Sequence, residues 1–574
     1  MKIKHILPIL ALAMASASCT DLERYPLDQG SSETWYQTET EFEMGLAELY
    51  RPVWWNLGQE SWNDDFFYRK IPGQGIIDGT LNSNTDIKGY IKLEEIYQYK
   101  YRCIVRANAL VDGIERGRAN GIQESKLINW EAQAKFVRAC QYGFLVFHWG
   151  DVVFVENMTT IEESYGKSRT PKAEVIKHMY EDFDYAIANL PESYAGYQQA
   201  TKGAALAMKA RYALWFGDWA VAAEAAKQCI ALADKGVYRL HPDFGEYFHA
   251  RNDRESIFYT PSSDPLNIIP GSAPFSSASS YVTRCAGGSA SKGPSWSLLA
   301  AFECTDGLTI DKSPLFDPKN PFKNRDPRCA ETLVEFGTEH LGVIFDPRST
   351  VTKVKNNNTG KQVKNNDAYP YQINASYNGL VWRKRVEESW GTGVKRATND
   401  QVIIRLADVY LIYAEAMIEQ NKIDDSVLEA INKVRARAYK CDVAAVNKYP
   451  AITTTDQKEL RRVVRRERHV EFAFEQLRYY DVIRWRIAKE AFNMPNCGLH
   501  STLADANDVI KKGHWFWDEA PTFSENDVPN FQVLIDKGYC TVHSQGNFPD
   551  RMYLWPIPAK EMLINPNMVQ NPGY

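Results

Sequence analysis

The chain has no excess of positive charge. Its 67 Lys and Arg residues are outnumbered by 72 Asp and Glu residues, which gives a formal net charge of −5 at pH 7. A protein that binds nucleic acid neutralises phosphates with a basic surface. The charge balance therefore argues against nucleic acid as a partner.

The sequence also lacks the short motifs that carry common catalytic or metal-binding chemistry. It contains no HExxH, GxSxG, P-loop, EF-hand loop or GxGxxG, and no two of its ten cysteines form a CxxC pair. We therefore expect no metal and no cofactor. A glycoside hydrolase stays open at this point, because its two carboxylates have no fixed sequence spacing.

Long apolar runs are missing after residue 18, so we expect no membrane-spanning helix. Residues 1–18 combine Lys2 and Lys4, a short apolar stretch and a few small residues, which is the order of a secretory signal peptide. Cys19 follows directly and resembles the lipid acceptor of a bacterial lipoprotein, although Ser16 replaces the usual leucine. The alternative is an ordinary secreted protein that is cut near the same place.

Helical periodicity dominates the first 235 residues and returns between 401 and 490. Apolar residues recur at three- and four-residue spacings, and short breaks separate the helices into pairs, such as 201–216 with 220–235. These pairs look like tetratricopeptide units, although the strict 34-residue consensus is absent. The pattern predicts a mostly α fold in which helical hairpins form a curved scaffold.

Residues 241–400 are instead rich in Ser, Gly, Pro and Asn, and residues 491–550 are similar. Such composition predicts long ordered loops with short strands, and loops on a rigid scaffold are where binding groups usually lie. We therefore divide the chain into a signal peptide (1–18), an N-terminal helical region (19–240), a loop-rich ligand-binding insert (241–400) and a C-terminal region (401–574).

Six segments resemble the SusD/RagB family of Bacteroidetes surface lipoproteins, and they occur in the family's order. They are YRCIVRANALVDGI, EAQAKFVRACQYGFLVFHWGDVVFV, NPFKNRDPRCAETL, QVIIRLADVYLIYAEA, RERHVEFAFEQLRYYDVIRW and the ending YLWPIPAKEMLINPNMVQNPGY. Together they extend over nearly the whole chain. The resemblance implies a non-enzymatic nutrient-binding lipoprotein, held at the cell surface of the outer membrane through lipid on Cys19 alone.

The resemblance also implies what the protein binds and where it delivers it. We expect an oligosaccharide ligand and a SusC-like TonB-dependent transporter as the partner. Two alternatives remain open, namely uptake of peptides of the RagB kind and, less favoured, a surface glycoside hydrolase. The sequence identifies neither the glycan nor its linkage or length.

A row of charged residues near the C-terminus is expected to be structural. Glu467, Glu471, Glu475 and Arg478 fall at offsets of four, four and three, which predicts one helix face, and Asp481 and Arg484 continue it. Buried charges must be paired, because an unpaired one costs several kcal/mol. We therefore expect a charge network that locks this helix to earlier hairpins.

Aromatic residues make up 12% of the chain, and those in the loop-like stretches are candidates for sugar binding. The flat C–H face of a pyranose packs well on an aromatic ring, and neighbouring polar groups then bind its hydroxyls. The candidates are Trp62, Tyr68, Tyr90, Tyr281, Trp296 and Trp390. Packing in the core is the alternative for each of these rings.

Overall fold

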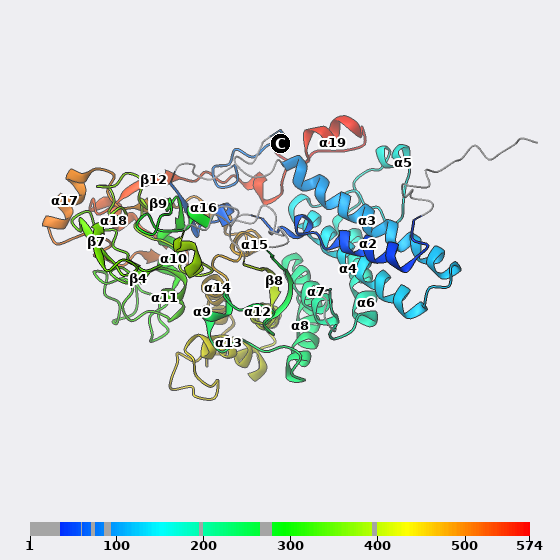
Figure 1. Ribbon diagram of the computed structural model, residues 1–574, viewed down its shortest axis with the longest axis horizontal. Helices are drawn as coiled ribbons and strands as arrows, with labels where there is room; N and C mark the ends of the chain where they lie inside the picture. Colours follow the sequence, from blue (N-terminus) through cyan, green and yellow to red (C-terminus); the bar gives the residue numbers. More distant parts are fainter. Residues whose placement is uncertain are drawn as a thin grey trace, which may run out of the picture.

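The computed structural model describes residues 35–58, 60–69, 75–84, 93–194, 199–263, 278–392 and 399–574. The molecule is elongated, with helices at one end and loops with short strands at the other (Figure 1). The expected mostly α fold class, with short strands confined to small sheets, is confirmed.

Antiparallel helical pairs build the helical end. The helix α4 packs against both α3 and α6, α7 packs against α8, and α8 packs against α12. The turn between α7 and α8 depends on Gly217, whose φ of 83° favours glycine. The bounds are α2 Glu39–Leu49, α3 Leu93–Ala119, α4 Glu124–Trp149, α5 Ile161–Tyr165, α6 Lys172–Asn189, α7 Lys202–Phe216, α8 Trp219–Asp234, α12 Leu406–Glu419 and α13 Asp425–Ala438.

The rest of the chain contains short strands and short helices, most of them at the opposite end of the molecule. Its strands are β1 Phe66–Tyr68, β2 Ser256–Thr260, β3 Lys292–Pro294, β4 Glu339–His340, β5 Val343–Ile344, β6 Lys353–Asn356, β7 Lys361–Lys364, β8 Gln401–Arg405, β9 Pro495–Gly498, β10 Thr522–Phe523, β11 Pro529–Asn530 and β12 Thr541–Gln545. Its helices are α9 Phe244–Tyr247, α10 Trp296–Ala301, α11 Arg328–Thr332, α16 Ala488–Phe492, α17 Leu503–Lys511, α18 Gln532–Asp536 and α19 Ala559–Ile564. The four strands β4–β7 form a meander, and the other strands pair two by two.

Two large hydrophobic cores and one small cluster (Ala290, Val334, Phe345 and Val381) form among the described residues. The two large cores join distant parts of the chain. One joins the helical pairs to residues 403–557, and the other combines residues of 278–390 with residues of 470–540. The strands β2 and β8 pair across the expected boundary at residue 400. The insert 241–400 thus contributes one strand to a pair whose other strand belongs to the C-terminal region.

A buried charge network centres on α14 (Gln457–Glu471) and α15 (Arg478–Arg484). The carboxylate of Glu471 pairs with three guanidinium groups: Arg328 at 2.9 Å, Arg405 at 2.8 Å, and Arg437. Burial alone would raise the pKa of Glu471, but these three positive charges hold it well below its usual range. All of these side chains are at most 4% exposed.

The same network reaches most of the surrounding elements. Arg328 also binds Glu467 at 2.6 Å, and Arg405 binds Glu475 at 2.8 Å. Further along, Arg484 binds Glu415 of α12 at 2.6 Å and Asp481 at 2.8 Å. The six residues singled out in the sequence thus lie buried, each in an ion pair.

The expectation of one continuous helix through these six residues is wrong. The helix α14 ends at Glu471, and Phe474 and Gln476 adopt left-handed conformations with φ of 64° and 65°. Because the helix is interrupted here, Glu475 forms ion pairs with Arg405 and Lys384. The ring of Phe474 stacks on Trp382, with 4.1 Å between the ring centroids. Tertiary contacts therefore override the local helical pattern here.

None of the described helices combines the length and the apolar character that crossing a bilayer requires.

We predict that Glu471→Gln lowers the free energy of unfolding by about 3–5 kcal/mol, because it leaves three buried guanidinium groups without their shared charge partner. Urea unfolding monitored by circular dichroism measures the change. The matched control is Glu429→Gln, which removes an exposed pair with Lys433 and should cost about 0.5 kcal/mol or less. Equal effects of the two substitutions would contradict the role given to Glu471.

Candidate functional site

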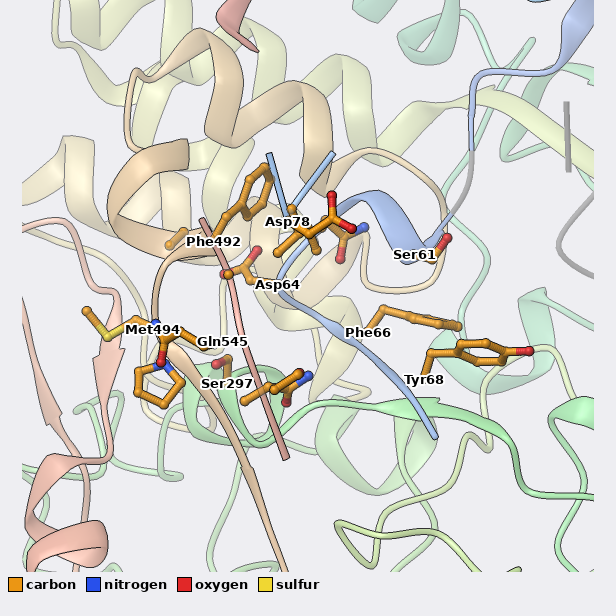
Figure 2. A pocket seen from close by; sticks show the side chains of 16 residues that line it. Ser61, Asp64, Phe66, Tyr68, Asp78, Ser297, Phe492, Met494 and Gln545 are labelled. Carbon is orange, nitrogen blue, oxygen red and sulfur yellow. The ribbon is translucent and has the colours of Figure 1, made fainter. Parts of the chain in front are cut away.

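A groove lies where the start of the chain meets the loop-rich end (Figure 2). Three stretches distant in sequence form its walls, namely residues 61–68 with 77–78, Ser297 of α10, and the C-terminal segments 491–496 and 544–546. Its lining mixes aromatic rings with amide, hydroxyl and carboxylate groups. Such a lining suits a ligand that has both apolar faces and many hydroxyls.

The strand β1 supplies the aromatic wall. Phe66 and Tyr68 are two residues apart, so their side chains project from the same face of the strand. Their rings lie 6.5 Å apart with an interplanar angle of 25°, side by side in Figure 2. Phe66 is buried, whereas Tyr68 is only half-buried and keeps ring surface open to the groove.

The charge network fixes the loop that precedes β1. Asp64 accepts two hydrogen bonds from Arg478, the first residue of α15, from Nε at 2.9 Å and from Nη2 at 2.8 Å. Burial would raise the pKa of Asp64, but Arg478 outweighs burial and the pKa lies below its ordinary value. Asp64 is therefore an ionised acceptor at the edge of the groove.

Two more polar side chains of this stretch line the groove. The Asn63 side chain is fully buried, and its Nδ2 has no hydrogen-bond partner among the described residues. A buried donor without a partner costs about 1–3 kcal/mol, which a ligand oxygen at this position would recover. Asp78 is half-buried, and its Oδ1 accepts hydrogen bonds from the backbone and hydroxyl of Thr80.

The opposite wall comes from the paired strands β9 and β12. Asn496 lies opposite Ser544 in the register, and Gln545 follows with its Nε2 donating to the carbonyl oxygen of Asn493. The next residue is glycine because a Cβ at Gly546 would lie 1.8 Å from the carbonyl oxygen of Phe492. This close approach brings the two C-terminal segments together beside β1.

Four of the six predicted sugar-binding rings are packed in the protein interior. Trp62, Tyr281, Trp296 and Trp390 are each at most 3% exposed. Trp62 contacts Tyr479 and Trp555, Tyr281 contacts Phe474, and Trp296 contacts Phe516 and donates from Nε1 to the carbonyl oxygen of Asn378. Stacking on a sugar needs an exposed ring face, so these four rings are corrected to packing residues.

The other two candidates have different outcomes. Tyr68 lines the groove, whereas Tyr90 lies outside the described residues. Cys19, the expected lipid acceptor, also lies outside them. The sequence analysis missed Asn496, Ser544 and Gln545, for which the only signal was the loop-like composition of residues 491–550.

Within the described ranges, no group of three or more His, Cys, Asp or Glu side chains is placed to hold a metal ion.

Two family models match the chain. One, described as "SusD family", matches residues 254–574, and the other, described as "Starch-binding associating with outer membrane", matches residues 27–214. The chain is similar to SusD-like protein P25 of Formosa agariphila, with 25% identity over 85% of this chain and 90% of that protein. It is 24% identical to SusD-like protein P2 of the same organism over the full length of both.

Solved structures share the fold over nearly the whole chain. A SusD-like carbohydrate binding protein from Bacteroides fragilis is 26% identical, with a TM-score of 0.73 over 93% of this chain and 99% of that chain. A laminarin binding SusD-like protein is 18% identical, with a TM-score of 0.58 over 94% and 100%. A structure with xylogluco-oligosaccharide is 19% identical, with a TM-score of 0.61 over 92% and 97%. The last two likenesses show the fold alone.

Because Trp62 packs against two rings beneath the groove, we predict that Trp62→Ala destabilises the protein by about 3–5 kcal/mol. Gly58 packs so closely on this ring that a Cβ at residue 58 would lie 2.4 Å from the ring of Trp62. Tyr68→Ala, in contrast, should stay within about 1 kcal/mol of the parent protein. Urea unfolding of both variants tests this, and a small effect of Trp62→Ala would reopen its role as a binding residue.

Proposed function

Since the chain belongs to the SusD family, we propose that it binds an oligosaccharide in the groove around Tyr68. The observation that carries the proposal is the half-buried Tyr68 ring beside a lining rich in hydrogen-bonding groups. The SusD-like carbohydrate binding protein from Bacteroides fragilis, which shares the fold, supports it.

The chemistry of the lining matches a sugar unit. A pyranose face packs on the ring of Tyr68, and the buried wall of Phe66 continues this apolar surface. Hydroxyl groups at the edge of the sugar find acceptors in Asp64 and Asp78 and side-chain amides in Asn496 and Gln545. Among the residues that the structure describes, no Lys or Arg lines the groove, and this lining favours a neutral unit.

The state of the carboxylates supports binding without cleavage. A glycosidase of the usual two-carboxylate kind needs one carboxyl group that remains protonated and donates to the leaving oxygen. Arg478 holds Asp64 ionised, with its pKa below the ordinary value. Glu60 has its pKa raised to about 8 by burial, but it is 3% exposed, accepts from the backbone N–H of Gln476, and does not line the groove.

Delivery to a transporter completes the proposed function. Lipid on Cys19 would hold the protein at the cell surface of the outer membrane, next to a SusC-like TonB-dependent transporter that receives the oligosaccharide. Tethering makes the second encounter effectively intramolecular, so modest affinities suffice for transfer. The matched family model described as associating with the outer membrane supports this location.

We predict that Tyr68→Ala weakens oligosaccharide binding at least about tenfold, because it removes the stacking surface, worth about 1.4 kcal/mol or more. Isothermal titration calorimetry with a panel of neutral plant, host and microbial oligosaccharides measures this. Tyr165→Ala is the control, since this tyrosine is 49% exposed on α5 and does not line the groove.

Other outcomes of the same panel favour the alternatives. Binding of peptides without binding of glycans would favour uptake of the RagB kind. Reducing sugar released by the purified protein would favour the hydrolase. Unchanged glycan affinity of Tyr68→Ala would contradict the assignment of the groove.

Cys19→Ala tests the proposed anchor separately from the groove. We expect the variant to lose retention in the membrane fraction, because acyl chains supply the membrane affinity. Its affinity for the oligosaccharide should equal that of the parent protein. Fractionation followed by calorimetry measures both properties, and full retention of the variant would contradict the anchor.

A further inference from the structure

A second hollow, separate from the groove, lies on the loop-rich end of the molecule. It has a volume of about 400 Å³ and shares no lining residue with the groove. Its walls are residues 319–323, Glu335 and Phe336, Arg348, and Trp515. We name this the basic hollow, because three of its lining residues are cationic, namely Lys319, Lys323 and Arg348.

Arg348 is held in a fixed position at this site. Asp346, which is 4% exposed, accepts from the backbone N–H of Arg348 at 3.0 Å and from its Nε at 2.9 Å, and also from its Nη2. This hydrogen bonding raises the pKa of Arg348 above its ordinary value. The guanidinium carbon lies 5.6 Å from the centre of the Trp515 ring.

Asp346 accepts hydrogen bonds from only one side of the guanidinium, formed by Nε and Nη2. Nη1 of Arg348 makes no hydrogen bond with any described residue, and the side chain is 44% exposed. A guanidinium that is oriented by one carboxylate and open at its other end is preorganised to bind a second anion. The basic hollow is where this free end can meet a ligand.

The two lysines add positive charge, and the carboxylate of Asp317 lies within electrostatic reach of Lys323. Lys319 and Lys323 are exposed, and neither forms an ion pair with a described residue. The only acidic residue in the lining is Glu335, so the walls carry a net formal charge of about +2 on a chain whose net charge is −5. The groove has the opposite character, because its described lining contains Asp64 and Asp78 but neither Lys nor Arg.

An aromatic wall stands beside these charges. Phe336 contacts Trp515 at 4.9 Å and Phe322 at 4.9 Å between ring centroids, both in edge-to-face geometry. All three rings are half-buried and line the basic hollow. Rings that keep exposed surface next to cationic side chains suit a ligand with both an apolar face and an anionic group.

We propose that the basic hollow binds a negatively charged sugar unit of the same oligosaccharide class, with a uronate carboxylate or a sulfate ester at Arg348, Lys319 and Lys323. This inference rests on the proposed function, which supplies the saccharide. The sugar ring packs against the aromatic wall, and its anionic group accepts from Nη1 of Arg348. The protein thereby prefers oligosaccharides that contain acidic units.

One hydrophobic core lies beneath both surfaces. Trp296, the neighbour of Ser297 in the groove, contacts Phe516, the neighbour of Trp515 in the basic hollow, at 4.9 Å between ring centroids. A change at one surface should therefore leave the other in place as long as Trp296 and Phe516 keep their packing. This separation allows the two sites to be tested one at a time.

The experiment compares matched ligands that differ only in charge. Calorimetry is run on the full-length protein with a galacturonic-acid oligomer, its carboxyl-reduced neutral counterpart, and a sulfated galactan oligomer with its desulfated counterpart. We expect the charged member of at least one pair to bind about tenfold more tightly and to lose this advantage in 0.5 M NaCl, because salt screens exposed charges. The pair that shows the preference identifies carboxylate or sulfate as the recognised group.

Variants then locate the preference. The double substitution Lys319→Ala/Lys323→Ala alters only exposed side chains and should abolish most of the preference, and Arg348→Gln should abolish it as well. The matched control is Lys353→Ala/Lys361→Ala on β6 and β7, which are exposed lysines outside the hollow. Thermal unfolding confirms that each variant is folded, so the lysine pair keeps the test valid even if Arg348→Gln destabilises the protein by leaving Asp346 unpaired.

The outcomes separate this inference from the proposed function. A preference that disappears in the lysine and arginine variants but persists in Tyr68→Ala supports the basic hollow. Equal binding of charged and neutral members, or a preference that survives the variants, overturns it while leaving the groove intact. Failure of every glycan to bind the parent protein overturns both.

Discussion

The buried carboxylate of Glu471 links three distant parts of the chain through ion pairs. Its partners are Arg328, Arg405 and Arg437. Burying ions costs several kcal/mol each, and the network recovers this only when every partner is in place. We infer that the network specifies one relative placement of the helical pairs and the loop-rich end, more than it adds net stability.

This placement positions the groove. After α14 ends, the chain turns so that the backbone N–H of Gln476 donates to Glu60. The helix α15 then begins at Arg478, which donates two hydrogen bonds to Asp64. Asp64 and Asp65 in turn accept at their carbonyl oxygens from Ser295, the cap of α10, which brings Ser297 to the groove. The groove is therefore an extension of the charge network, and buried ion pairs fix the positions of its walls.

The helical pairs could be predicted from the sequence because their signal is local and periodic. The pair α7–α8 follows from apolar spacing and a glycine turn, the pair α12–α13 follows from apolar spacing alone, and the family motifs identify the overall architecture. Sequence reasoning failed where tertiary contacts decide. Trp62, Tyr281, Trp296 and Trp390 lie in loop-like sequence yet are buried. The mainly helical core includes Trp62, and the second core, built largely from loops, includes the other three. The wall formed by Asn496 and Gln545 depends on a pairing of β9 with β12 that no local pattern encodes.

A crystal structure of the protein with an oligosaccharide that it binds would show whether the groove around Tyr68 binds sugar without cleaving it. The account predicts an intact sugar chain with one pyranose ring against Tyr68 and its hydroxyls within hydrogen-bonding distance of the side chains of Asp64, Asp78 or Asn496. A cleaved product in the groove, or a ligand bound at neither the groove nor the basic hollow, would contradict it.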